Sequence, residues 1–216
     1  MLDPVLTTIL ITLGGYLLGS ISGSLVLGRF RGVDIRAMGS GNAGGTNALR
    51  TVGWKFALGV VLIDIGKGVL AAAALPALAP YLSSNPSDPL LLASLAGFAA
   101  VLGHIWPLYF GFQGGKGAGT AVGVILIIAP WCLAPMLTVW LVTVFGTGYV
   151  GLATILAGLS LVPAMWLIGP EPLPPVLGAL AIALAVLLIF THRANLARMR
   201  SGTENRFEKA RLIKRR

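Results

Sequence analysis

Long apolar runs constrain this chain more than any other feature of its sequence. Several windows of roughly 17 to 25 apolar residues follow one another, and each could cross a bilayer core of about 30 Å as a helix. Hydrophobic residues make up 56% of the 216 residues and charged residues only 11%, whereas soluble domains are about a quarter charged. We therefore expect an all-α polytopic membrane protein, with one integral membrane domain over residues 1–216.

The apolar runs predict seven transmembrane helices. We expect them at residues 5–27, 54–79 and 90–110, as a pair of short spans within 120–145, and at 152–168 and 176–191. The run 120–145 is too long for one helix and contains Pro130 and Pro135, which break helices, so it is divided into two spans. Residues 28–53 are expected to form a polar loop.

The basic residues predict the orientation in the membrane. Nine of the sixteen Lys and Arg follow Thr191, and five more lie between Arg29 and Lys55. Seven crossings place every basic loop on one face, as the positive-inside rule requires, whereas an even number separates the basic loops from the basic tail. We therefore expect an outer N-terminus and a cytoplasmic tail at 192–216. This tail favours anionic membrane lipids over nucleic acid as the partner of the cations.

Three unusual polar segments are predicted to meet on the cytoplasmic face: residues 39–50, 112–120 and 192–204. Glycines let backbone N–H groups approach a ligand, while Lys, Arg, Ser, Thr and Asn add charge and oriented hydrogen bonds. This composition is typical of a phosphate site. The second segment lacks the spacing of a nucleotide-binding P-loop and follows no strand, so nucleotide hydrolysis is not indicated. Taken alone, it is equally typical of a tight turn.

Ionisable residues within the apolar runs have two interpretations. Asp64 and Lys67 share one helix face and form either a functional site or a self-neutralising pair that fixes helix rotation. His192 is a base, a phosphate ligand or an interfacial anchor, and the same alternatives apply to His104. With Cys132 as the only cysteine, these two histidines predict no metal site.

Together the three segments resemble known motifs of the bacterial acyl-phosphate:glycerol-3-phosphate acyltransferases. The run from Gly39 to Asn47 is similar to the first cytoplasmic motif of that family, and the resemblance extends over nearly the whole chain. The second motif is matched by Gly114-Gly115-Lys116-Gly117 with Thr120, and the third by His192-Arg193 with Asn195, Arg198, Gly202 and Glu204. Gly45 stands where alanine is usual, and Ala118-Gly119 stands where a bulkier pair is usual. The seven-span topology of the family, with its N-terminus outside, agrees with the charge argument.

The resemblance implies transfer of an acyl group from acyl-phosphate to the sn-1 hydroxyl of glycerol 3-phosphate, without a cofactor. The products are lysophosphatidic acid and inorganic phosphate. In this family the reaction is the first step of phospholipid synthesis, and it takes place at the cytoplasmic face of the bacterial plasma (inner) membrane. The alternatives are a transporter of a phosphorylated metabolite and a scaffold whose glycine turns only connect helices. Against a transporter, no outer loop carries a cation to receive an anion.

Candidate residues follow from the motifs and from the two dianionic substrates. The catalytic candidates are Ser40, Arg50 and His192; the acyl-phosphate candidates are Ser40, Asn42, Thr46, Gly114, Gly115 and Gly117. The glycerol 3-phosphate candidates are Asn47, Lys67, Lys116, His192 and Asn195, and Glu204 is expected to be structural. Either His192 or the substrate phosphate is the general base.

Overall fold

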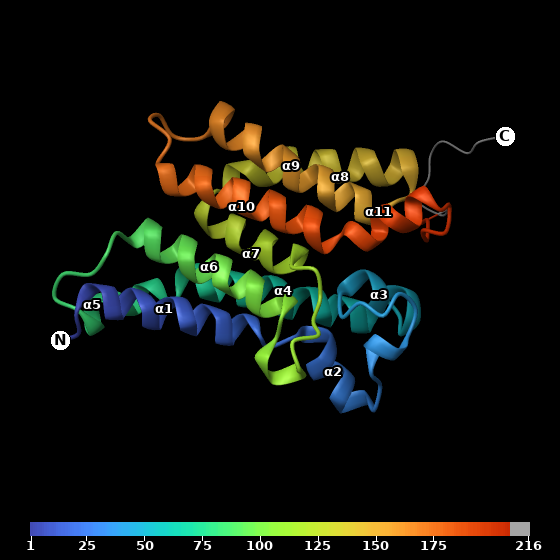
Figure 1. The fold of residues 1–216 in the computed structure, drawn as a ribbon, viewed down its shortest axis with the longest axis horizontal. Helices are drawn as coiled ribbons and strands as arrows, with labels where there is room; N and C mark the ends of the chain where they lie inside the picture. Colours follow the sequence, from blue (N-terminus) through green and yellow to red (C-terminus); the bar gives the residue numbers. More distant parts are fainter. Residues whose placement is uncertain (208–216) are drawn as a thin grey trace. The chain divides into compact units, whose positions relative to one another are not determined.

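The computed structural model describes residues 1–207, so part of the predicted lipid-binding tail, residues 208–216, lies outside the described residues. Every regular element within residues 1–207 is a helix, which confirms the all-α class. The chain divides into two compact units, Met1–Ile128 and Ala129–Arg216 (Figure 1).

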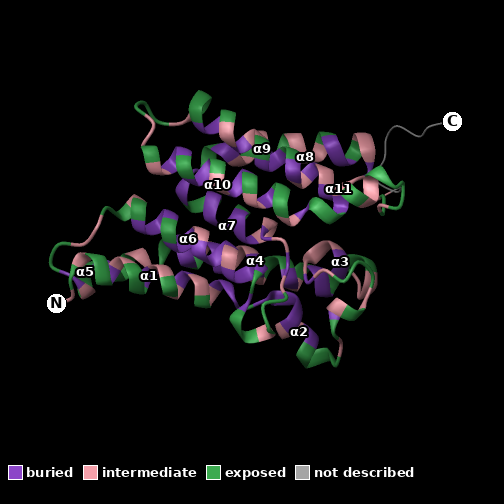
Figure 2. Ribbon diagram, viewed as in Figure 1, coloured by how far each residue is buried: buried purple, intermediate pink, exposed green. Residues whose placement is uncertain are grey.

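The first unit is built around α6 (Pro89–Ile105), which contacts three other helices: α1 (Pro4–Gly19), α4 (Trp54–Ala73) and α7 (Ala118–Ile128). Figure 2 shows α6 as largely buried along its length. The shorter elements of this unit are α2 (Gly23–Arg31), η1 (Ile35–Ala37), α3 (Gly45–Thr51), η2 (Pro76–Leu78), α5 (Ala79–Leu82) and η3 (Leu108–Phe110).

Small residues let these helices approach closely. A side-chain carbon added at Gly15 or Gly19 of α1 would overlap backbone atoms of α6, and one added at Gly68 of α4 or Gly123 of α7 would overlap the backbone of the facing helix. Lipid offers no hydrophobic force between helices, so close van der Waals packing of this kind holds membrane helices together.

The first apolar run is not one straight helix as predicted. α1 ends at Gly19, α2 begins at Gly23, and the two helices are bent by 41°. Helix ends leave carbonyl groups without intrahelical partners. Two such carbonyls at this break, on Gly19 and Ile21, accept hydrogen bonds from Lys67 of α4 at 2.8 and 2.9 Å. A side chain from another helix therefore satisfies the carbonyls that the break exposes.

The second unit contains η4 (Pro130–Cys132), α8 (Leu133–Thr147), α9 (Val150–Ile168), α10 (Pro175–Thr191) and α11 (Arg193–Arg200). α9 contacts both α8 and α10, and α10 and α11 are bent by 48°. The predicted break within run 120–145 is confirmed, because α7 ends at Ile128 and Pro130 opens η4 before α8 begins.

Within residues 1–207, four helical stretches are long and apolar enough to cross a membrane: Trp54–Leu82, Pro89–Phe110, Pro130–Thr147 and Val150–Ile168. The bent pairs α1–α2 and α10–α11 raise the number to six if each is one span. α7 has 11 residues and a length of about 16 Å, short of the roughly 30 Å core. Large apolar side chains lie exposed on these helices, such as Leu13 and Leu62, as a lipid environment allows.

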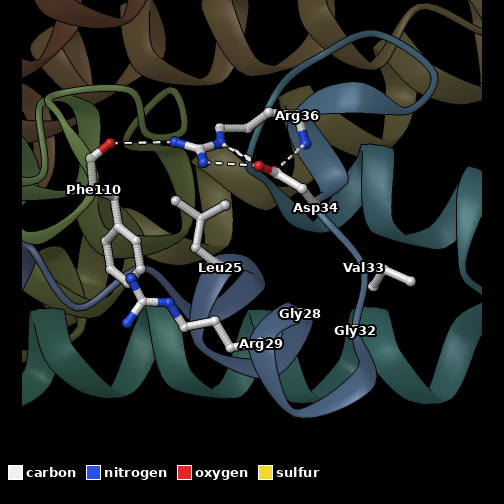
Figure 3. A pocket seen from close by; sticks show the side chains of 8 residues that line it. All are labelled: Leu25, Gly28, Arg29, Gly32, Val33, Asp34, Arg36 and Phe110. Atoms are coloured by element: carbon white, nitrogen blue, oxygen red, sulfur yellow. Dashed lines mark hydrogen bonds and ion pairs between the residues drawn. The ribbon is translucent and has the colours of Figure 1, made fainter.

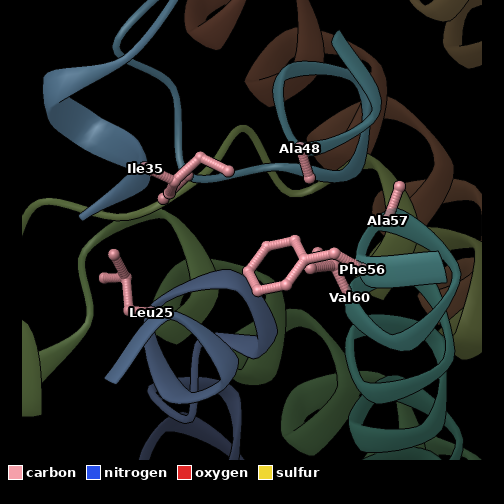
Figure 4. Packing of buried hydrophobic residues seen from close by; sticks show 7 residues of the cluster. Leu25, Ile35, Ala48, Phe56, Ala57 and Val60 are labelled. Carbon is pink, nitrogen blue, oxygen red and sulfur yellow. The ribbon is translucent and has the colours of Figure 1, made fainter. Parts of the chain in front are cut away.

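Residues 28–53, predicted to be a loop, instead contain the end of α2, η1 and α3. Their apolar side chains form a small core with the start of α4 (Figure 4). Ile35 and Ala48 are fully buried there against Leu25, Phe56 and Val60. This core fixes both ends of the first glycine-rich segment to the helical frame.

Candidate active site

Asn47 organises the first glycine-rich segment. Its side chain is 2% exposed, and its Nδ2 donates to the carbonyls of Ile35, Met38 and Asn42 at 3.1, 2.9 and 3.1 Å. Its Oδ1 accepts the Ser40 N–H at 3.0 Å. The two N–H protons are shared among three carbonyls, so this one amide group contacts four backbone groups of a loop that has no regular structure of its own.

Ser40 lies between two glycines in the left-handed region, Gly39 with φ 56° and Gly41 with φ 72°. A side chain at either position would be strained, so the turn requires glycine. Ser40 is exposed, and its hydroxyl makes no hydrogen bond with the part of the chain that the structure describes. The turn therefore presents an unengaged hydroxyl on a fixed backbone.

The second glycine-rich segment closes the C-terminal end of α6. The N–H groups of Gly114 and Gly115 donate to the carbonyls of Ile105 and His104 at 3.2 and 3.0 Å. Gly117 follows with φ 88°, and its carbonyl accepts the N–H of Ala121 in the first turn of α7. The segment is therefore a turn between two helices, which agrees with the interpretation of its glycines as a tight turn.

Backbone donors are left over where α7 begins. The N–H groups of Gly117, Ala118 and Gly119 have no acceptor among residues 1–207. Unsatisfied N–H groups and the positive end of the helix dipole make a helix N-terminus a place for anions. Lys116, partly exposed, directly precedes these three residues. The N–H groups of Gly114 and Gly115 are already engaged, so the backbone donors available to an anionic group here are those that follow Gly115.

The two glycine-rich segments meet within the first unit. A side-chain carbon on Gly115 would lie only 2.9 Å from the carbonyl oxygen of Ala43, so the two backbones are nearly in contact. Asn42, Thr46 and Arg50 belong to the same segment as Ala43: Thr46 is in the first turn of α3, and Arg50 is exposed in its last turn.

A buried polar cluster lies beside this contact. Asp64 and Lys67 of α4 and His104 of α6 are 4%, 3% and 3% exposed. Lys67 Nζ lies 2.8 Å from His104 Nδ1 and 3.2 Å from Asp64 Oδ1. The predicted pair thus has a third member from another helix. The sequence had singled out His104 but gave it no partner.

A pocket of about 210 Å³ lies between α2, η1 and η3 (Figure 3). Its lining consists of Leu25, Gly28, Arg29, Gly32, Val33, Asp34, Arg36 and Phe110. The Arg29 guanidinium lies 4.8 Å from the centroid of the Phe110 ring, and Arg36 Nη1 donates to the Phe110 carbonyl at 3.2 Å. None of the predicted site residues lines this pocket, and its arginines tie η3 to α2 and η1.

Arg36 also pairs with Asp34, with its Nη2 2.8 Å from Asp34 Oδ2. Hydrogen bonds from the Arg36 side chain and backbone hold the pKa of the Asp34 carboxyl below its ordinary value. The same carboxylate raises the pKa of Arg36. Both side chains are substantially exposed, so solvent screens this pair.

The third motif is organised within the second unit by Glu204. Its two carboxylate oxygens accept hydrogen bonds from Asn195 Nδ2 and Arg198 Nε, each at 2.7 Å. Asn195 also packs against Gly151, where a side-chain carbon would lie 2.8 Å from the amide group. The chain after α11 thus folds back onto this helix.

His192, at the junction of α10 and α11, is 5% exposed. Its Nδ1 lies 2.9 Å from the Leu188 carbonyl oxygen, which can only accept, so Nδ1 is the donor. The neutral ring therefore has its unprotonated nitrogen at Nε2. That nitrogen is the one able to accept a proton.

Residues 9–202 match the family model described as glycerol-3-phosphate acyltransferase, and this match covers both units. The chain is 39% identical over 226 residues to a glycerol-3-phosphate acyltransferase of Chlorobaculum parvum, covering 94% of this chain and 97% of that one. It is 41% identical over 209 residues to the enzyme of the same description from Shouchella clausii, with coverage of 95% and 98%.

A solved structure is also similar along almost the whole chain. It is the crystal structure of PlsY (YgiH), an integral membrane glycerol 3-phosphate acyltransferase, in its glycerol 3-phosphate form. The TM-score is 0.83 at 34% identity, with 94% of this chain and 96% of that chain covered. Its lysophosphatidic acid form gives a TM-score of 0.80 at the same identity. This chain belongs to the glycerol-3-phosphate acyltransferase family.

Proposed function

We propose that this protein transfers an acyl group from an acyl-phosphate to the sn-1 hydroxyl of glycerol 3-phosphate, forming lysophosphatidic acid and inorganic phosphate. Family membership supports the acyltransferase activity and the acceptor. The two forms in which PlsY was solved match the acceptor and the product. The choice of acyl-phosphate as the donor is supported by the resemblance of the sequence motifs.

The observation that carries the proposal is the contact of the two glycine-rich segments at Gly115 and Ala43. It brings the Ser40 turn and the start of α7 into one unit, where unpartnered backbone donors follow Lys116. A phosphate and an adjacent carbonyl need this combination of a cation, N–H donors and a hydroxyl. We assign Ser40, Asn42, Thr46 and Gly117 to the acyl-phosphate, with Arg50 as a catalytic cation. Gly114 and Gly115, whose N–H groups bind the carbonyls of Ile105 and His104, form the turn that positions these donors.

The candidates for glycerol 3-phosphate are Lys116 in the first unit and, in the second unit, His192 and Asn195. Glu204 holds Asn195 through their 2.7 Å hydrogen bond. Asn47 and Lys67, the remaining acceptor candidates, have their side-chain donors engaged by protein groups. Their contribution to the substrate is therefore through the loops and helices that they hold in place.

The reaction needs no covalent acyl-enzyme, because an acyl-phosphate is a mixed anhydride with a good leaving group. The sn-1 oxygen attacks the acyl carbon, an ester C–O bond forms, and the C–O bond to the phosphate breaks. Positioning of the two substrates and stabilisation of the developing oxyanion supply the catalysis. Ser40 and the backbone amides at the start of α7 act as the hydrogen-bond donors.

The proton of the sn-1 hydroxyl goes either to His192 Nε2 or to the phosphate of bound glycerol 3-phosphate, whose second pKa near 6 follows that of phosphoserine. His192→Ala separates these routes. If the rate at saturating glycerol 3-phosphate is retained and only KM rises, the histidine acts in binding; if kcat falls, it acts as the base.

We further propose seven crossings of the bacterial inner membrane, with the N-terminus outside and the active site at the cytoplasmic face. The distribution of Lys and Arg supports this topology, because an odd number of crossings keeps all basic loops on one side. α7 would then be a short crossing. Cysteines introduced into the loop at 83–88 and into the tail, labelled with an impermeant reagent in intact cells, test this: labelling of the loop alone agrees with it.

The function is tested with purified protein in detergent. Phosphate release is measured with acyl-phosphate alone, with glycerol 3-phosphate alone and with both, for wild type and Ser40→Ala. We expect release only with both substrates and a large loss of kcat in the variant. Uptake of a phosphorylated metabolite into sealed vesicles without chemical change would instead support a transporter, and an acyl group trapped on Ser40 would overturn direct transfer.

A further inference from the structure

The buried cluster of Asp64, Lys67 and His104 is not used by the chemistry above. Burying three ionisable groups is costly unless they are paired and hydrogen-bonded. Here each group meets this condition: besides its contacts with the other two, Asp64 accepts the Gly23 N–H at 3.2 Å, and Lys67 binds two carbonyls at the α1–α2 break. Four helices therefore share one polar junction.

The distances define where the protons lie. An ammonium group has three protons, and the three shortest contacts of Lys67 Nζ are the carbonyls of Gly19 and Ile21 and His104 Nδ1, at 2.8, 2.9 and 2.8 Å. His104 Nδ1 therefore accepts, and the ring carries its proton on Nε2. Asp64, at 3.2 Å from Nζ and 3.3 Å from Nδ1, balances the charge of Lys67, so the cluster is neutral.

The Nε2 edge of His104 faces the second glycine-rich segment. A side-chain carbon added at Gly115 would overlap Nε2 and lie 2.8 Å from Cε1 and 2.9 Å from Ala43 O. In addition, the Gly115 N–H binds the His104 carbonyl. The imidazole ring therefore packs directly against the Gly114–Gly115 turn, where this turn approaches Ala43 of the first glycine-rich segment.

We propose that Asp64, Lys67 and His104 form a positioning cluster, in which Lys67 holds the His104 ring with its proton on Nε2 and this ring sets the position of the Gly114–Gly115 turn. Its consequence for acyl-phosphate binding depends on the proposed function, whereas the proton arrangement does not. His104 and Lys67 are positioning residues: they act on the substrate through the turn and not by contact.

The proton arrangement is measured by NMR on the full-length protein in lipid bilayers with ¹⁵N-labelled histidine. The chain has two histidines, so the spectrum of His104→Asn identifies the His192 signals by difference. We expect opposite neutral forms: His104 protonated on Nε2 and His192 protonated on Nδ1, because of the Leu188 carbonyl. A His104 ring protonated on Nδ1 overturns the proposal.

Lys67 is tested as the cause of this arrangement in the double variant Asp64→Asn/Lys67→Met. Removing both charges together avoids leaving one of them buried and unpaired. We expect the His104 signals to lose the exclusive Nε2–H form. Retention of the wild-type pattern would show that Lys67 does not set the tautomer.

The effect on the turn is tested with two substitutions at one site. In His104→Asn the side chain places an oxygen near the position of the imidazole Nδ1 and no atom at that of Nε2. In His104→Gln the longer side chain carries a polar atom to the position of Nε2. For His104→Asn we expect KM for acyl-phosphate to rise about tenfold, as is usual for loss of an outer positioning group, with KM for glycerol 3-phosphate nearly unchanged. His104→Gln should recover most of this loss.

Thermal unfolding of both variants separates positioning from folding. Equal losses of activity and of Tm in the two variants would contradict the proposal and indicate a purely structural residue. If the wild-type protein shows no two-substrate activity, the proposed function fails, and the NMR result still decides the proton arrangement.

Discussion

Asn47→Asp separates the two roles that a polar residue in a glycine-rich loop can have. The substitution keeps Oδ1, which accepts the Ser40 N–H, and replaces Nδ2 by an oxygen facing three carbonyls at 2.9 to 3.1 Å. The amide group has two N–H protons, so about two full hydrogen bonds of about 1 kcal/mol each are lost, giving about 2 kcal/mol before any repulsion between oxygens. For a loop with comparable populations of ordered and open forms, this loss lowers the ratio of ordered to open loop about 30-fold.

The assay is phosphate release with both substrates at saturating concentrations, together with thermal unfolding. We expect a large fall in kcat for Asn47→Asp, because the backbone of Ser40 loses its fixed position. Ser40→Ala is the matched control, since it removes only the hydroxyl and should leave Tm unchanged. A variant with wild-type kcat and a raised KM for glycerol 3-phosphate alone would refute the loop-organising role and make Asn47 a direct substrate ligand.

Four further substitutions test the packing and the ion pairs. Gly103→Ala should lower Tm, because the added methyl group overlaps backbone atoms of α1, whereas Gly66→Ala in open space should stabilise α4 by up to about 1 kcal/mol; thermal unfolding compares them. Glu204→Gln should destabilise the fold by about 2 kcal/mol, since only one of its two hydrogen bonds can be kept, and a wild-type Tm would contradict this. Because the pKa of Asp34 is lowered in the folded protein, its pairing with Arg36 contributes a stabilisation that is complete above the ordinary pKa of 3.8 and is lost as the pH falls through the lowered value. The variant Asp34→Asn cannot form this ion pair, so a plot of Tm against pH should lack the small fall in Tm that the wild type shows at low pH.

The helical frame could be predicted because membrane helices are recognised by length and hydrophobicity alone. The expected boundaries of the later spans agree closely with α9 and α10, and prolines marked the division between α7 and α8. The break after α1 could not be predicted in the same way. No proline marks it, and the carbonyls that it exposes are bound by Lys67, a residue far along the chain.

The candidate site was found by residue type, but the roles of its members depend on tertiary contacts. An asparagine among glycines is equally typical of a phosphate ligand and of a loop organiser, and only the carbonyls of Ile35, Met38 and Asn42 distinguish them. Likewise, His104 gains its significance from Gly115, which packs on its ring. A histidine near the end of an apolar span, shortly before a Gly-Gly pair, was the available signal.

The most direct test of the account is the identity of the acyl donor. Purified protein is mixed with glycerol 3-phosphate and either an acyl-phosphate or the corresponding acyl thioester, and lysophosphatidic acid is quantified by mass spectrometry alongside phosphate release. We predict product only from the acyl-phosphate, with one phosphate released for each lysophosphatidic acid formed. Equal product from the thioester, or phosphate release without lysophosphatidic acid, would contradict the account.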